Sequence, residues 1–255
     1  MVSSANFAPL SGNYIADILI SEGTEAVFRK NSKIKFKKND IIYQSAYSIG
    51  KLYFPIDMIV SFVCDLSSGY SAEFMQIGCD GVVGISAIMG GGATINTAIA
   101  QTSGTAYRVD AAIIQQVFDN SPNFRRTILK YMQALMQESA QRIVCYRHHS
   151  VLQQLCRTLL MAANRLRSEK VSLTHEQLAL AIGCRREAIS VAAGKIQAAG
   201  LIDYAYGRIT IRDRAGLEAC CCECYEVIRR AFSDFLPSGS GLLGADNLQG
   251  GGNDG

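Results

Sequence analysis

Residues 172–200 place basic, acidic and hydroxyl side chains at the start of a predicted helix, where they can contact another molecule. Thr174 precedes an apolar run and Gln177 follows three positions later, which is the spacing of a capping box that begins a helix. Gly183 ends that short helix, and a second helix is predicted to begin near Arg185. Two short helices joined by a glycine turn are typical of a helix-turn-helix.

The outer face of the second predicted helix carries side chains suited to reading bases. Arginine donates two hydrogen bonds to guanine and glutamate accepts one from cytosine, so Arg186 and Glu187 are candidate base readers. Thr174 and His175, at the start of the first helix, are candidate phosphate contacts. The full set of expected DNA-binding residues is Thr174, His175, Arg185, Arg186, Glu187, Ser190, Lys195 and Arg208.

An apolar inner face and a following hairpin strengthen this interpretation. The predicted inner positions are Leu178, Ala179 and Ile182 on the first helix, and Ala188, Ile189, Ala192 and Ile196 on the second. Apolar and polar residues alternate over 201–211 in two runs separated by a Tyr206-Gly207-Arg208 turn. This pattern predicts a two-stranded hairpin, or wing, whose arginine contacts phosphate. The alternative is a small three-helix domain with surface arginines, and it does not explain the cap, the turn and the hairpin together.

The segments before this motif differ in the spacing of their apolar residues along the chain. Residues 13–21 have the apolar spacing of a short helix. Residues 24–110 alternate short β-rich runs with turn signals, which predicts an all-β sandwich or barrel. Residues 110–119 are predicted to form a short helix, and Ser121-Pro122 to begin a long one, because serine caps helices well and proline suits the first turn.

The long predicted helix has one apolar stripe that needs a partner. We expect a dimer seam, with packing on the β domain as the alternative. Its apolar positions are Phe124, Ile128, Met132, Leu135, Met136, Ile143 and Tyr146.

Residues 173–211 resemble the C-terminal DNA-binding domain of the Crp/Fnr transcription regulators. The resemblance rests on the run THEQLALAIGCRREAISV, which begins at Thr174. Two positions depart from the family pattern: Arg185 stands where serine or threonine is common, and Val191 where a base-contacting arginine is common. The resemblance implies a homodimer that binds a pseudo-palindromic double-stranded DNA operator, with RNA polymerase as a partner if the protein is an activator.

The resemblance also implies an α+β fold with an N-terminal β-roll (a double-stranded β-helix, jelly-roll-like) as sensory domain. The expected boundaries are an N-terminal segment with a short helix at 1–22, a cyclic-nucleotide-binding-like β-roll at 23–120, a dimerisation helix at 121–147, a winged helix-turn-helix domain with a C-terminal helix at 148–236, and a disordered tail at 237–255.

The nucleotide site that the family implies is degenerate here. Ile85, after Gly84, stands where the family has a glutamate for the ribose, and Asn96 stands where it has an arginine for the phosphate, followed by Thr97 and Ala98. A buried phosphate without a cationic partner is unfavourable. We therefore expect no response to cyclic AMP, no resident cofactor and an effector of unknown identity.

Nine cysteines in a long chain without a recognisable signal peptide indicate reduced thiols. Cys145, His148 and His149 share one helical face and are weak candidates for zinc ligands, the alternative being a polar helix end. The group Cys220–Cys224 is expected on a C-terminal helix, with burial as small hydrophobes the alternative to a redox or metal role. A redox- or metal-responsive regulator is thus an alternative function. An N-terminal iron–sulfur cluster is not supported, because the first cysteine is Cys64.

Composition sets outer limits on the function. The chain has 255 residues and a formal net charge of +3, which permits a nucleic-acid partner. No stretch approaches the ~20 apolar residues of a membrane helix, so we expect a cytoplasmic protein without a membrane partner. The three histidines and the absence of recognisable catalytic motifs argue against an enzyme. A non-DNA-binding signalling module that keeps the β-roll remains a further alternative, against which the recognition face argues.

Overall fold

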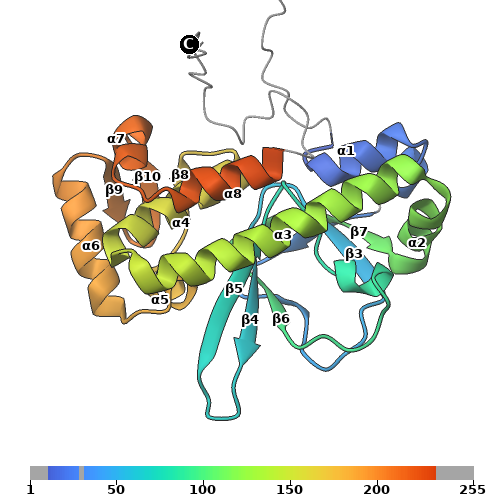
Figure 1. Ribbon diagram of the computed structural model, residues 1–255, viewed down its shortest axis with the longest axis horizontal. Coiled ribbons are helices and arrows are strands. Elements are labelled where there is room, and N and C mark those ends of the chain that lie inside the picture. Colours follow the sequence, from blue (N-terminus) through green and yellow to red (C-terminus); the bar gives the residue numbers. More distant parts are fainter. Residues whose placement is uncertain (1–10, 29–31, 234–255) are drawn as a thin grey trace, which may run out of the picture.

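The computed structural model describes residues 11–28 and 32–233, which form a β-roll and a C-terminal helical domain linked by one long helix (Figure 1). The expected disordered tail at 237–255 lies outside the described residues, as do residues 1–10 of the expected N-terminal segment. None of the helices in the described part is long and apolar enough to cross a membrane.

The β-roll consists of two antiparallel sheets with strand orders β1-β7-β3 and β2-β6-β4-β5. Their strands are β1 (Lys33–Phe36), β2 (Ile41–Tyr43), β3 (Lys51–Pro55), β4 (Val60–Asp65), β5 (Ser71–Ile77), β6 (Thr97–Ala100) and β7 (Gly104–Asp110). Leu52 and Phe54 of one sheet and Val60 and Ala98 of the other are buried in one core. The predicted all-β domain is therefore confirmed.

Short helices close the roll. They are α1 (Tyr14–Ser21), the 3₁₀ helices η1 (Glu25–Phe28) and η3 (Ile85–Ile88), and α2 (Ala111–Asn120). Asn13 caps α1 by accepting a hydrogen bond from the Ala16 N–H at 3.0 Å. Its side-chain amide also donates to the carbonyls of Pro55 and Gly81, both at 2.8 Å, and so fixes α1 to the roll.

The long helix α3 (Pro122–His148) begins where the sequence predicts, with the Ser121 hydroxyl accepting from the Phe124 N–H at 3.0 Å. The predicted single apolar stripe is wrong, because its residues divide between two faces. Phe124, Ile128 and Leu135 are buried against their own chain. A second face leaves Leu129, Met136 and Ile143 exposed, and we call these three residues the α3 seam.

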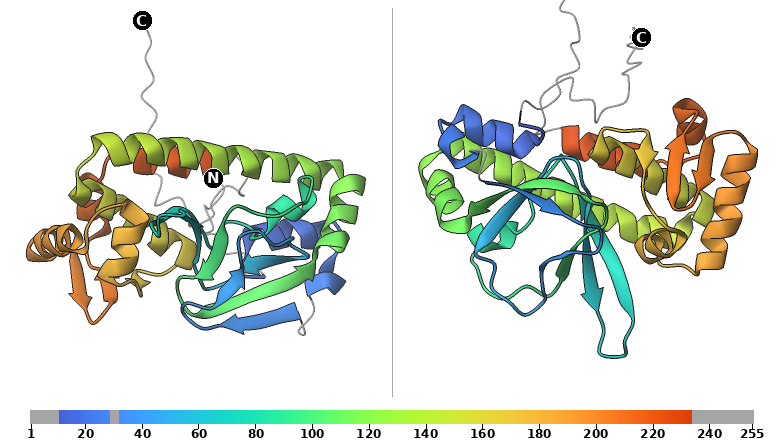
Figure 2. Two further views of the ribbon diagram at one scale, coloured as in Figure 1. Left: turned by 90° about the horizontal axis from the view of Figure 1, so that it is seen from below. Right: turned by 180° about the vertical axis from the view of Figure 1, so that it is seen from behind.

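The C-terminal domain contains a three-stranded sheet of order β8-β10-β9 (Figure 2). Its elements are α4 (Val151–Leu166), β8 (Lys170–Val171), α5 (His175–Ile182), α6 (Arg186–Ala198), β9 (Ile202–Ala205), β10 (Arg208–Ile211), α7 (Arg214–Ala219) and α8 (Cys224–Ser233). Helix α8 lies beside α3, so the last helix of the described residues contacts the element that joins the two domains (Figure 1).

The loop at 78–84 joins the roll to both other parts of the molecule. A Cβ atom on Gly78 would lie 2.5 Å from Cβ of Arg165 in α4, and one on Gly81 would lie 2.4 Å from Oη of Tyr131 in α3. The Tyr131 hydroxyl donates to the Val82 carbonyl and accepts from its N–H, both at 3.2 Å. Glycine is required at both positions because neighbouring helices approach the backbone directly.

Buried charges connect the same three parts. Arg165 of α4 donates from Nε to Asp80 of the roll at 3.0 Å and from Nη2 to Glu138 of α3 at 2.7 Å. Arg142 pairs with Glu138 at 2.9 Å and lies 3.7 Å from Glu73 of β5. All five side chains are at most 4% exposed, and we call them the junction charge cluster.

Candidate DNA-binding surface

The two helices of the motif form as their sequence signals require. The Thr174 hydroxyl accepts from the Gln177 N–H at 3.3 Å, and the Gln177 side chain accepts from the Thr174 N–H at 3.0 Å. Gly183 then ends α5 with φ of 75°, a left-handed conformation that favours glycine. The Thr174 hydroxyl is thus occupied in the cap, and its predicted phosphate contact remains a prediction.

Helix α6 buries one face and exposes the other. Ile189, Ala192 and Ile196 are buried as predicted, whereas Ala188 is half-buried. The exposed face carries five of the expected DNA-binding residues, namely Arg185, Arg186, Glu187, Ser190 and Lys195. Arg186 pairs with Glu176 at 2.7 Å, but both side chains are more than 60% exposed, so the pair is weak and its guanidinium can exchange partners.

His175 ties the first helix of the motif to the second. Its Nδ1 lies 2.9 Å from Oγ of Ser190, and its ring stacks on Tyr204 with centroids 4.4 Å apart. Partial burial, together with the nearby Arg186 guanidinium, lowers the pKa of His175 and so favours the neutral ring. The expected phosphate contact His175 and the expected DNA-binding residue Ser190 therefore lie side by side, one at the start of α5 and the other on α6.

The wing has the predicted form. Strands β9 and β10 are joined by Tyr206 and Gly207, with φ of 52° and 73°. Positive φ at both turn residues matches a tight hairpin, although tyrosine is an uncommon residue there. Tyr206 is fully exposed, and Arg208 is exposed at the start of β10.

Three residues of the expected nucleotide-site remnant, Gly84, Ile85 and Asn96, line a cavity of about 410 Å³ between the roll and α3. Its lining consists of Tyr43, Phe62, Phe74, Met75, Gly84, Ile85, Ser86, Met89, Asn96, Met132, Leu135, Met136 and Ser139, so within the described residues no charged side chain contributes to it. Asn96 accepts a hydrogen bond from the Tyr43 hydroxyl at 3.1 Å. Thr97 and Ala98 do not line the cavity: Thr97 Oγ1 accepts from the Ser45 N–H and Ala98 is buried in the roll.

The two cysteine groups differ from the sequence interpretation. Cys145 and His149 converge, but His148 is exposed and lies outside their cluster, so the three-residue ligand face is wrong. His149 follows the last residue of α3 in an extended conformation, which redirects its side chain. The group Cys220–Cys224 does not lie on one helix either, because Cys220 caps the end of α7 and Cys224 begins α8.

Two of these findings had no local sequence signal, and a third had one. The junction charge cluster and the convergence of Cys145 with Cys222 depend on contacts between residues far apart in the chain. The α3 seam was detectable in principle, because Leu129, Met136 and Ile143 recur every seven residues.

Together, the exposed α6 face, the wing and the roll define a winged helix-turn-helix protein with a β-roll as its other domain. Residues 153–220 match the family profile of the Crp-like helix-turn-helix domain. A search of curated proteins finds no match.

Solved structures share this fold over about three quarters of the chain. FixK2 from Bradyrhizobium japonicum is 15% identical with a TM-score of 0.66, over 74% of this chain and 96% of that one. A CRP-family transcriptional regulator from Thermus thermophilus is 21% identical with a TM-score of 0.61, over 73% and 95%. The c-di-GMP-responsive global regulator CLP of Xanthomonas campestris is 17% identical with a TM-score of 0.58, over 74% and 98%. The resemblance is therefore confirmed: the C-terminal domain is a Crp-like helix-turn-helix domain, and the described chain has the fold of Crp/Fnr regulators.

Proposed function

We propose that this protein is a transcription regulator that binds a pseudo-palindromic double-stranded DNA operator as a homodimer. The observation that carries the proposal is the exposed start of α6, where Arg185, Arg186 and Glu187 stand together on a helix whose opposite face is buried. Such a helix presents its N-terminal residues to base edges in the major groove. A role in the cytoplasm as a regulator rather than an enzyme follows from this proposal, with RNA polymerase as a further partner if the protein activates transcription.

The α3 seam supports the dimeric part of the proposal. Leu129, Met136 and Ile143 are 59%, 71% and 68% exposed, which is unfavourable for large apolar side chains that recur on one helical face. A second α3 helix packed along this seam would bury them. Two recognition helices related by the dyad would then meet half-sites about one helical turn, ~34 Å, apart.

Selection of bound duplexes from a random DNA pool with the purified full-length chain tests the proposal. We expect an enriched sequence with two inverted half-sites about one turn apart. Recovery of unrelated sequences, with affinity that depends only on salt, would contradict sequence-specific binding.

Arg186→Ala is expected to weaken binding to the selected operator by about 1–3 kcal/mol and to relax preference at one base position. Arg208→Ala is the matched comparison, because a phosphate contact at the wing should weaken all sequences alike and reduce the salt dependence. Both are measured by fluorescence anisotropy against a set of operators with single-base changes. If Arg186→Ala lowers affinity equally for every operator, Arg186 does not read a base.

Cyclic AMP is expected not to bind in the cavity at micromolar concentration. The cavity offers Ile85 and Asn96 where an acidic and a basic side chain would be needed, and its other walls are mainly apolar. Transfer of a phosphate into such a site without a charged partner is unfavourable. Isothermal titration calorimetry measures this directly. Saturable micromolar binding would contradict the prediction and would require a cation from elsewhere.

A further inference from the structure

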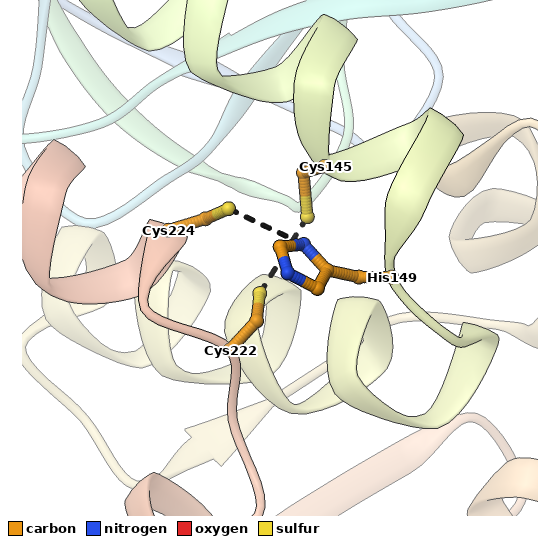
Figure 3. Close-up of side chains that lie close together, drawn as sticks. All are labelled: Cys145, His149, Cys222 and Cys224. Atoms are coloured by element: carbon orange, nitrogen blue, oxygen red, sulfur yellow. Dashed lines mark hydrogen bonds between the residues drawn. The ribbon is translucent and has the colours of Figure 1, made fainter.

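Four side chains with metal-binding atoms converge where α3 ends and α8 begins (Figure 3). Cys145 and His149 come from the last turn and the cap of α3, whereas Cys222 and Cys224 come from the start of α8 and the residues just before it. Their sulfur and nitrogen atoms all lie within 4.8 Å of one another. The three cysteines are buried and His149 is half-buried, so solvent reaches the group only at the histidine.

The distances fit a tetrahedral centre. Sγ of Cys145 lies 3.6 Å from Sγ of Cys222, and Sγ of Cys224 lies 3.4 Å from Nδ1 of His149. Zinc binds thiolate sulfur at about 2.3 Å and imidazole nitrogen at about 2.0–2.1 Å, which places neighbouring ligand atoms of a tetrahedron roughly 3.5–3.8 Å apart. One ion at the centre therefore needs only small side-chain adjustments.

Neighbouring polar groups orient the ligands as a metal centre requires. Nε2 of His149 lies 3.2 Å from a carboxylate oxygen of Glu223. A hydrogen on Nε2 would leave Nδ1, the atom that faces Cys224, free to bind a cation. The side-chain amide of Gln141 donates to Sγ of Cys224 at 3.1 Å, a contact that stabilises a thiolate.

The charges near the cluster are also those that a three-thiolate site needs. Three thiolates and one Zn²⁺ carry a net charge of −1. Arg157 is 1% exposed, and its Nε and Nη2 atoms have no hydrogen-bond partner. Its guanidinium lies close enough to interact electrostatically with Cys145 and Cys221. A buried cation within electrostatic reach of the thiols is thus available to balance an anionic centre.

We propose that Cys145, His149, Cys222 and Cys224 form a structural Zn²⁺ site. The complete set of four protein ligands leaves no open position for a substrate, as in structural rather than catalytic zinc centres. The bound ion would fasten the start of α8 to the end of α3, at the place where the long helix meets the DNA-binding domain. This site is independent of whether the protein binds DNA.

Metal analysis of the full-length chain, purified without an affinity tag and under reducing conditions, tests the proposal. After reconstitution with ZnCl₂ and removal of free metal, mass spectrometry of the metal content should give one zinc per chain. Replacement by Co²⁺ should give the intense visible bands of tetrahedral cobalt and a near-ultraviolet thiolate-to-cobalt band. A zinc content far below one per chain, or a cobalt spectrum typical of octahedral oxygen ligands, would overturn the proposal.

Matched variants assign the ligands. Cys222→Ser and His149→Ala should lose the metal, whereas Cys220→Ser and His148→Ala should keep it, because these two neighbours lie outside the cluster. Circular dichroism establishes that each variant is folded, and the metal content and cobalt spectrum of the unaltered chain decide the question if a variant is not. Equal zinc in all four folded variants, or a Cys145–Cys222 disulfide that forms in place of zinc binding, would show that the assignment is wrong.

Discussion

Met136→Glu combined with Ile143→Glu is expected to convert the proposed dimer into monomers and to weaken operator binding by about 10²–10⁴-fold. Both residues lie on the α3 seam and are 71% and 68% exposed, so the substitutions place no charge in the buried core of one chain. In a dimer, four carboxylates would have to be buried between two helices, which is unfavourable. Loss of the second recognition helix then removes the gain from binding two half-sites together.

Light scattering measures the mass and fluorescence anisotropy measures DNA affinity for the same samples. Gln137→Glu is the control, because this position is exposed on the same helix but lies off the seam. Leu135 is unsuitable for such a test: it is 5% exposed, and a charge there would disrupt the fold of the single chain. A double variant that keeps the mass and affinity of the unaltered protein would place the dimer interface elsewhere.

Arg165→Met is expected to lower the free energy of unfolding by about 3–5 kcal/mol. The substitution keeps most of the side-chain volume but removes the donors that Asp80 and Glu138 accept from at 3.0 and 2.7 Å. Two buried carboxylates would lose a cationic partner, and this loss costs more than the net value of the original ion pairs. Urea unfolding monitored by circular dichroism gives the change.

Arg230→Met is the matched comparison on the surface. Arg230 pairs with Glu226 at 2.8 Å, but its side chain is 76% exposed, so we expect a change of less than about 1 kcal/mol. A similar loss in the free energy of unfolding for both variants would show that burial does not determine how much the junction charge cluster contributes to stability.

The pH dependence of stability gives a second test of the same cluster. Burial alone would raise the pKa of Glu138, but the guanidinium groups of Arg165 and Arg142 lower it below its ordinary value. A lowered folded-state pKa stabilises the protein above the unfolded-state value of ~4.3, and this stabilisation is lost as the pH falls through the folded-state pKa. Arg165→Met should therefore reduce the loss of stability on acidification below about pH 4.3.

The sequence predicts the DNA-binding motif well because its signals are local. The Thr174–Gln177 capping box, the left-handed Gly183 and the hairpin turn each act within a few residues, and the structure contains all three. The β-roll strands are predicted for the same reason, since turn signals separate short β-rich runs.

Long-range contacts are not predictable from such signals. Nothing in the sequence distinguishes Arg165 from the other basic residues near it. Only the fold brings it to Asp80, which is 85 residues away in sequence. The periodicity of α3 identifies apolar positions but cannot separate Leu135, which packs on its own chain, from Met136, which does not. Cys145 and Cys222 likewise meet across 77 residues, so neither group alone indicates the four-ligand set.

Met136 belongs to two features at once, because it lines the apolar cavity and also lies on the exposed α3 seam. Binding of a molecule in the cavity and association of two chains would therefore both contact the Met136 side chain. The rotamer of Met136 then contributes to the free energy of binding and to the free energy of association. Any molecule that binds the cavity more tightly in one association state must shift the monomer–dimer equilibrium toward that state. Thermodynamic reciprocity then requires association to change the affinity for that molecule by the same factor per site, so the strength of this coupling can be measured from either side.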